Sequence, residues 1–238
     1  MHATNFSAAI TMQEADRTFY CNCTPVLTYS AEYPQAALPC NPTGQFCINR
    51  DICVQVRAFY CYVSNDLFRQ AVEGCREACQ NGYPFNGYDA VQHFEITYNQ
   101  QCHFSLYRDQ YTYTGGAHGG TVRSSDTWSL KTGCRLPLAS FFPNKKDYRA
   151  FLIGQITCLA DQQMQQNPGI YFENYRELIR KYFDEQSYYL TPDGLAIYYQ
   201  QYEIAPYATG IVVFTIPYQT LKWQPGCGNA DVPLGKRP

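Results

Sequence analysis

The stretch FEITYNQQCHFSL, residues 94–106, carries the clearest signal for the fold of this chain. Apolar and polar residues alternate over 94–98 and again over 102–106, which is the pattern of strands with one buried face. Residues 99–101 are polar and fit the loop of a hairpin between the two strands. Consecutive strands joined by a short loop run antiparallel, so this stretch predicts an antiparallel sheet.

Helical patterns lie on both sides of this hairpin. Upstream, apolar residues recur every three or four positions from a start capped by Asn49 to a stop at Asn81-Gly82. Downstream, similar patterns predict a helix that begins after Pro143, is capped by Asn144 and stops at Asn167, followed by a shorter helix over 175–182. Further strands are expected at residues 26–33, 111–113, 121–130, 188–190, 195–199 and 211–216.

The order of these elements predicts the fold class and the domain organisation. Strands that cluster as hairpins and helices that cluster as pairs favour an α+β fold over an alternating parallel sheet. We expect antiparallel sheets packed with helices in two closely joined, disulfide-rich lobes. Residues 1–110 should form a cysteine-rich N-terminal lobe, residues 111–222 a second lobe, and residues 223–238 a tail.

Composition excludes several classes of function. The 238 residues include 18 Lys and Arg against 20 Asp and Glu, a net charge of −2, whereas a nucleic-acid binder needs a basic stripe. The same balance gives no polybasic attraction to an anionic membrane. Tyrosine is unusually frequent at 22 residues, and its rigid ring with a polar tip suits hydrated contact surfaces.

The twelve cysteines indicate the compartment. Their number is even, no C-x-x-C pair occurs, and only four histidines accompany them, so a zinc site is not expected. We expect disulfides, no metal, no cofactor and an extracytoplasmic location, either secreted or as an ectodomain whose membrane anchor lies outside this sequence. The disulfide candidates are Cys21, Cys23, Cys40, Cys47, Cys53, Cys61, Cys75, Cys79, Cys102, Cys134, Cys158 and Cys227.

The glycine-rich stretch TGGAHGG, residues 114–120, is the first candidate site. A strand follows it where a phosphate-binding loop would need Lys-Ser/Thr and a helix, so it does not predict phosphate binding. His118 fits a hydrogen-bonded structural turn or, together with Gly116, part of a binding surface. Catalysis would require a partner such as Asp126 or Glu203, and no nucleophile–base motif is present.

The second candidate site is the stretch YEIAPYATG, residues 202–210, which joins two predicted strands. Its Pro206-Tyr207 tip is conformationally restricted, and a restricted aromatic loop loses little entropy when it binds a partner. Two interpretations of Tyr207 stay open, because its ring can either face a partner or fold back on the sheet. Glu203 is either a functional acid or a surface and turn residue.

These two stretches belong to a set of segments that resembles the C-terminal domain of RsiV-like anti-sigma factors. The resemblance covers roughly residues 110–222, and the residues upstream look like the companion domain that also precedes peptidoglycan deacetylase domains. The matching segments are YTGGAH (113–118), WSLKTG (128–133), LPLASFF (136–142), YLTPDGLAIYY (189–199), YEIAPYATGI (202–211) and FTIPY (214–218).

The resemblance implies a non-catalytic recognition module of the bacterial cell envelope. The expected partner is lysozyme or a related cell-wall hydrolase, bound in a sensor or inhibitor role. Two other interpretations remain, a module that binds peptidoglycan or another glycan through tyrosines, and a hydrolase that uses His118. The residues expected to bind the partner are Gly116, His118, Glu203, Pro206 and Tyr207.

Overall fold

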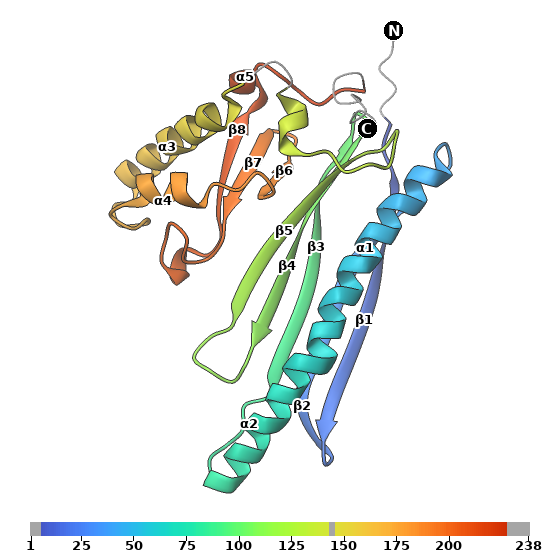
Figure 1. Cartoon of the computed structure of the whole chain (residues 1–238), viewed down its shortest axis with the longest axis vertical. Coiled ribbons are helices and arrows are strands. Elements are labelled where there is room, and N and C mark those ends of the chain that lie inside the picture. Colours follow the sequence, from blue (N-terminus) through green and yellow to red (C-terminus); the bar gives the residue numbers. More distant parts are fainter. Residues whose placement is uncertain (1–5, 143–145, 228–238) are drawn as a thin grey trace, which may run out of the picture.

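The computed structural model describes residues 6–142 and 146–227 and confirms the α+β fold class (Figure 1). Its larger sheet has five strands in the order β1-β2-β3-β4-β5. Neighbouring strands are antiparallel except β2 and β3, which run parallel because a long helical segment connects them. The strands are β1 (Ala9–Cys21), β2 (Thr24–Ala37), β3 (Tyr88–Gln100), β4 (His103–Tyr113) and β5 (Gly120–Ser129).

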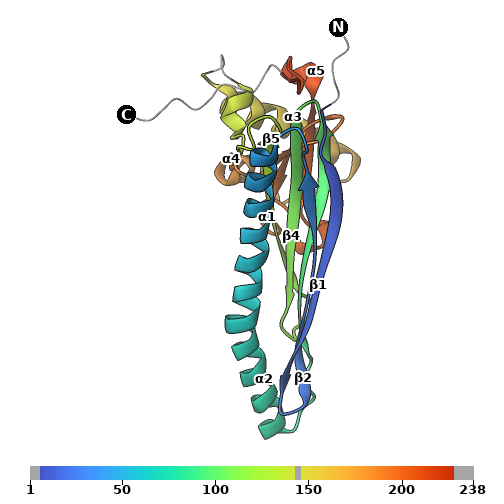
Figure 2. The same cartoon turned by 90° about the vertical axis from the view of Figure 1, so that its right-hand side faces the viewer.

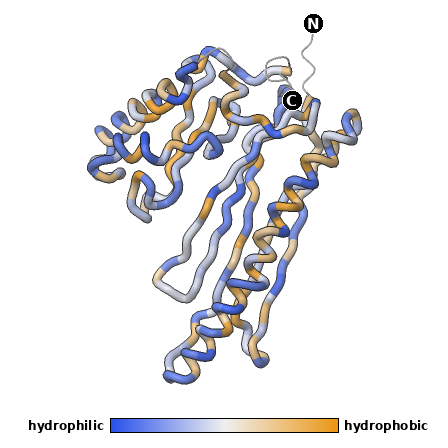
Figure 3. The backbone as a smooth tube through the Cα atoms, viewed as in Figure 1, coloured by the Kyte–Doolittle hydropathy of each residue, from blue (hydrophilic) through white to orange (hydrophobic). Residues whose placement is uncertain are grey.

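The connecting segment is a nearly continuous rod along one face of this sheet (Figure 2). It consists of α1 (Pro42–Tyr62), a π-helical turn η1 (Val63–Leu67) and α2 (Phe68–Asn81). Apolar residues recur along it between polar ones (Figure 3), and the side chains that it buries follow a helical period. The buried residues include Ile48, Ile52, Phe59, Val63, Leu67 and Ala71.

The two ends of this rod compare differently with the sequence prediction. Gly82 ends it in the left-handed conformation at φ 74°, as expected. The expected cap Asn49 is wrong, because the helix begins about two turns earlier, where Asn41 Oδ1 accepts a hydrogen bond from Gly44 N–H at 3.0 Å. Asn49 instead pairs through its amide with the backbone of Ala36.

The second lobe packs helices against a three-stranded antiparallel sheet in the order β6-β7-β8. Aromatic side chains fill its core, and Tyr199 Oη donates a hydrogen bond to the Ile179 carbonyl at 3.0 Å, which ties the sheet to a helix. The elements are η2 (Leu138–Phe141), α3 (Tyr148–Gln166), α4 (Tyr175–Tyr182), β6 (Tyr188–Leu190), β7 (Gly194–Tyr199), η3 (Tyr207–Thr209), β8 (Val212–Pro217) and α5 (Tyr218–Leu221).

The lobes divide along the sequence at a different place from the one expected. The expected boundary between residues 110 and 111 falls inside β4, and β5 also belongs to the larger sheet. The second sheet begins at Tyr188 and lies against β4 and β5, where Leu190 N–H donates to Ser105 Oγ at 3.0 Å. Of the expected tail, residues 223–227 are described, and residues 228–238 lie outside the described part of the chain. The expected helix cap Asn144 also lies outside the described residues.

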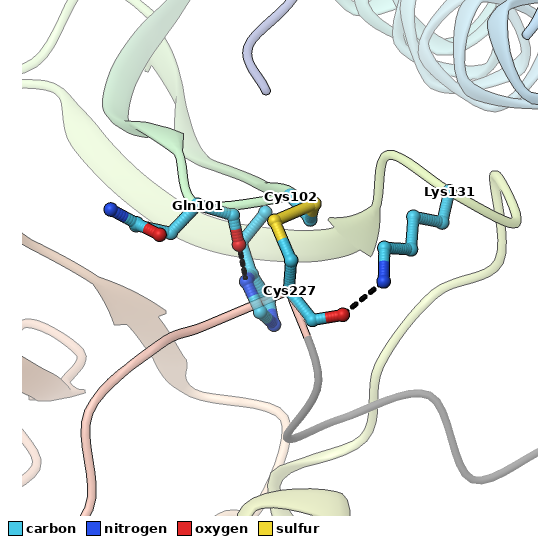
Figure 4. The surroundings of a disulfide bond; sticks show 5 residues. Gln101, Cys102, Lys131 and Cys227 are labelled. Atoms are coloured by element: carbon cyan, nitrogen blue, oxygen red, sulfur yellow. Dashed lines mark hydrogen bonds between the residues drawn. A yellow bond between two sulfur atoms is a disulfide. The ribbon is translucent and has the colours of Figure 1, made fainter. Parts of the chain in front are cut away.

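One disulfide joins two of the twelve candidate cysteines, Cys102 and Cys227 (Figure 4). Cys102 lies in the β3–β4 turn with a positive φ of 64°, so the second strand of the hairpin begins one residue later than expected, at His103. Cys227 follows α5, and its carbonyl accepts a hydrogen bond from Lys131 Nζ. The bridge thus fastens the end of the described chain to the larger sheet.

The other ten candidate cysteines are free thiols, which differs from the expected set of bridges. Seven of them are exposed. Several lie too far from another cysteine along the same helix to form a disulfide. Cys53 and Cys61, for example, lie about 12 Å apart along the axis of α1, whereas a disulfide needs Cα atoms within about 7 Å.

The described residues contain no helix that is long and apolar enough to cross a membrane. Within residues 6–142 and 146–227, no three His, Cys, Asp or Glu side chains are arranged to hold a metal ion.

Replacing both Cys102 and Cys227 with serine should lower the free energy of unfolding by about 2–4 kcal/mol. The physical reason is that the bridge closes a loop of 125 residues and so restricts the unfolded chain. Urea denaturation measures the change. The matched control replaces Cys53 and Cys61, both exposed free thiols, and should change stability by less than about 0.5 kcal/mol. Equal stability of the two double variants would contradict the structural role of the bridge.

Candidate functional site

The two candidate loops, far apart in the sequence, lie against each other in the structure. The His118 ring, in the β4–β5 loop, stacks on the Tyr207 ring with centroids 3.9 Å apart and planes 20° apart. Tyr207 Oη also donates a hydrogen bond to the Gly119 carbonyl at 3.0 Å. The structure therefore unites His118 and Tyr207 in one place, with Tyr207 half-buried and His118 exposed.

Two further aromatic residues, which were not among the residues expected to bind a partner, extend this contact. The Tyr202 ring lies 5.7 Å from the Tyr207 ring, and Tyr202 is 56% exposed. The Tyr111 ring packs so closely on Gly119 that a Cβ atom added there would lie 2.4 Å from it. We call Tyr111, His118, Tyr202 and Tyr207 the aromatic platform. For Tyr111 the sequence signal is the abundance of tyrosine, and Tyr202 is in addition the first residue of the second candidate stretch.

Hydrogen bonds from side-chain amides to the backbone of β5 hold the second candidate loop in place. Gln200 Oε1 accepts from Arg123 N–H at 3.0 Å, and Gln200 Nε2 donates to the Arg123 carbonyl at 2.7 Å. Gln201 Oε1 accepts from Thr121 N–H at 3.0 Å. These two side-chain amides pair with the free edge of β5 as a neighbouring strand would, and so they set the position of Tyr202 and Tyr207 relative to His118.

The other expected site residues have different surroundings. Glu203 is half-buried, and its carboxylate accepts a hydrogen bond from Gln200 N–H at 2.7 Å, so it supports its own loop. Burial raises the pKa of the Glu203 carboxyl above its ordinary value, although the bond from Gln200 opposes this. Gly116 is exposed at the tip of the β4–β5 loop, and Pro206 precedes η3 beside Tyr207.

The structure does not bring Asp126 to His118. Asp126 accepts hydrogen bonds from Arg108 at 2.8 Å and Gln55 at 2.7 Å, and it pairs with Arg135 at 3.1 Å. Asp126 lies six residues beyond Gly120 along β5, and at 3.3 Å per residue this separates the two residues by about 20 Å. Among the described residues, no carboxylate lies within hydrogen-bonding distance of His118, whose Nδ1 is 3.1 Å from the Gly119 carbonyl.

Charged residues form a row across the open face of the larger sheet, next to the platform. Glu14, Glu32, His93, Asp109 and Arg123 are directly paired from β1 to β5. His93 lies 3.2 Å from Glu32, and both Arg123–Asp109 contacts are shorter than 3 Å. Since Arg123 is committed to Asp109, the exposed part of the row is mainly acidic.

Comparisons with known proteins give two family matches in successive parts of the chain. Residues 21–121 match the family model described as "Deacetylase PdaC", and residues 139–219 match the model "Protein of unknown function (DUF3298)". The expected resemblance is confirmed at the level of these two domains, each of which covers less than half of the chain. No curated protein matches the chain.

Two solved structures share the fold over nearly their whole length. A DUF3298 family member from Bacteroides fragilis has a TM-score of 0.69 at 18% identity, covering 96% of this chain and 99% of its own. A DUF3298 family protein from Pseudomonas aeruginosa has a TM-score of 0.58 at 15% identity, covering 91% and 94%. The chain therefore shares its overall fold with these two structures.

Replacing Gly119 with alanine should lower the free energy of unfolding by about 1–3 kcal/mol, because the new Cβ overlaps both the Tyr111 ring and the Thr112 carbonyl. Gly116→Ala is the matched control in the same loop, since nothing lies within 4 Å of a Cβ atom there. Urea denaturation of both variants tests the packing. The close contact between Gly119 and Tyr111 is contradicted if the two variants are equally stable.

The raised pKa of Glu203 predicts a pH-dependent stability difference. Because the folded state favours the protonated acid, ionisation of Glu203 costs stability as the pH rises above its unfolded pKa of about 4.3. Glu203→Gln should therefore be at least as stable as the parent at pH 7, and any advantage should vanish below about pH 4. Thermal unfolding across this range measures it, and carbon-13 NMR of the Glu203 carboxyl should show a midpoint above the ordinary value. An advantage that grows as the pH falls would contradict the sign.

Proposed function

We propose that this chain is an extracytoplasmic recognition module that binds lysozyme or a related cell-wall hydrolase, in a sensor or inhibitor role. The observation that carries the proposal is the stack of His118 on Tyr207 with the exposed Tyr202 beside it. Tyrosines that are already held in place bind a partner at low entropic cost, and they are typical of energetic hot spots in interfaces. A cleft shaped for a sugar chain is a suitable receptor for such aromatic groups.

Two further features support this proposal. The acidic row on the open sheet face, with Glu14 and Glu32 beyond the platform, would attract a basic enzyme and orient its approach. The Cys102–Cys227 disulfide is typical of proteins in oxidising compartments, which supports a place outside the cytoplasm. The DUF3298 and PdaC matches agree with an extracellular domain, and the anti-sigma role is implied by the RsiV-like resemblance.

The exposure of Tyr202 also favours a second candidate function, binding of peptidoglycan glycan. A half-exposed tyrosine ring stacks well on the apolar face of a sugar, and Tyr202 has this exposure at 56%. We rank this second because the platform is small and its other rings are partly used by internal stacking. We also propose that the module is non-catalytic, since Asp126 is held by Arg108, Arg135 and Gln55 and not by His118.

Replacing Tyr202 with alanine should weaken lysozyme binding by about 2 kcal/mol, or about thirtyfold in Kd, as for a hot-spot aromatic residue. Stability should change by less than about 0.5 kcal/mol, because the ring is exposed. Tyr207→Ala should impair both binding and stability, since this ring is stacked and hydrogen-bonded. Calorimetric titration with lysozyme and thermal unfolding of each variant provide the measurements.

The matched control is Tyr20→Ala, which removes an equally exposed ring, at 58%, from β1, the edge strand on the opposite side of the larger sheet from β5. Its Kd for lysozyme should equal that of the parent. If all three variants bind lysozyme as the parent does, the platform is not the binding surface. If the parent binds insoluble peptidoglycan but not lysozyme, and Tyr202→Ala loses that binding, the second candidate function replaces the first.

A further inference from the structure

A recess lies where the two lobes meet, away from the aromatic platform. It has a volume of about 620 Å³, within the usual range for small-ligand sites. We call it the junction cleft. Its lining comprises residues 125–127 of β5, residues 135–138, Arg149 and residues 183–186 with Tyr188.

The junction cleft contains an open position in the edge of β5. In an antiparallel ladder, backbone groups of alternate residues point away from the partner strand. At Thr121 the outward N–H is bonded to Gln201, and at Arg123 both the N–H and the carbonyl are bonded to Gln200. At Thr127 the outward carbonyl accepts from Leu136 N–H at 2.8 Å.

Ser125 lies between these capped positions and has the same outward orientation. Ser125 pairs with Tyr107 of β4, and the pairs Asp109–Arg123 and Ser105–Thr127 lie two residues away on either side. Within the part of the chain that the structure describes, nothing bonds to its backbone N–H or C=O, although its hydroxyl donates to the Tyr188 carbonyl at 2.5 Å. An unpaired strand edge is a template for another extended chain.

The rim of the junction cleft carries charges of both signs. The Arg149 side chain is 60% exposed and lies 3.4 Å from Glu185, while the carboxylate of Asp184 on the same segment accepts a hydrogen bond from Gln186 N–H at 3.0 Å. Arg135 also lines the cleft; its side chain is 49% exposed and pairs with Asp126 at 3.1 Å. A ligand with both an anionic and a cationic group can therefore bind at the rim while its backbone reaches β5.

We propose that the junction cleft binds a short extended peptide that pairs with the backbone of Ser125 and carries charges of both signs. Backbone pairing at an open sheet edge supplies affinity, and pockets and charges beside it supply specificity. The open stretch from Arg123 to Thr127 spans about 13 Å, which limits the paired segment to about four residues. This site is separate from the platform and does not depend on the proposed function.

The test is an NMR titration of the nitrogen-15-labelled full chain with the tetrapeptide Lys-Val-Thr-Glu, followed to millimolar concentration. Peptide binding should shift the amide signals of Ser125, Asp126 and Thr127. Two further peptides carry a single backbone N-methyl group, one on Val and the other on Thr. Because only alternate amides face the edge, one N-methyl peptide should lose binding while the other keeps it.

Ser125→Pro removes the outward N–H without breaking the β4–β5 ladder, and edge strands tolerate proline at such positions. It should weaken the peptide by about fivefold or more, the effect of one lost hydrogen bond. Ser125→Ala keeps the N–H, removes the hydroxyl and should bind as the parent does. Tyr202→Ala should also bind the peptide normally, so failure here is distinguishable from failure of the proposed function.

The proposal is overturned if the peptide shifts no signals at residues 125–127, or if both N-methyl peptides bind as tightly as the parent peptide. Should Ser125→Pro not fold, the N-methyl pair tests the same hydrogen bond on the unaltered chain. Shifts confined to the platform would also reject the junction cleft as the binding site.

Discussion

Strand β5 is the element on which the arrangement of the two lobes depends. Its inner edge pairs with β4 from Gly120 to Ser129, and its outer edge bonds to Gln200, Gln201 and Leu136. An uncovered edge strand would invite pairing with other chains, so the second lobe also protects the sheet. The same hydrogen bonds fix the angle and distance between the lobes, because they are short and directional.

The position of the candidate binding surface depends on these contacts between β5 and the second lobe. His118 belongs to the loop that precedes β5, and Tyr207 belongs to the loop that the glutamines hold against β5. The two stacked rings therefore come from different lobes. The hydrogen bonds between β5 and the second lobe therefore hold exposed aromatic groups in a fixed arrangement. Groups that are already fixed lose little entropy when a partner binds. The open position at Ser125 results from the same capping, since the caps lie on both sides of it.

The fold was predictable where neighbouring residues carry a period. The long helix, its stop at Gly82 and the hairpin after residue 94 all follow from patterns within a few positions. Strand β1 was not predicted, because it lies at the edge with most of its side chains exposed and so shows weak alternation. The cap at Asn49 was misplaced since Asn41-Pro42 gives an equally good start, and packing of Asn49 against Ala36 selects between them.

The sequence by itself determined the α+β class, the main helices and hairpins, and the two loops that carry His118 and Tyr207. The tertiary structure decided the rest: the bridge between Cys102 and Cys227, the addition of Tyr111 and Tyr202 to the platform, and the separation of Asp126 from His118. The physical reason is the separation in sequence between the residues that interact. Helix and strand periods reflect contacts between residues a few positions apart, whereas the pairing of side chains about 80 residues apart depends on how the two lobes meet along β5.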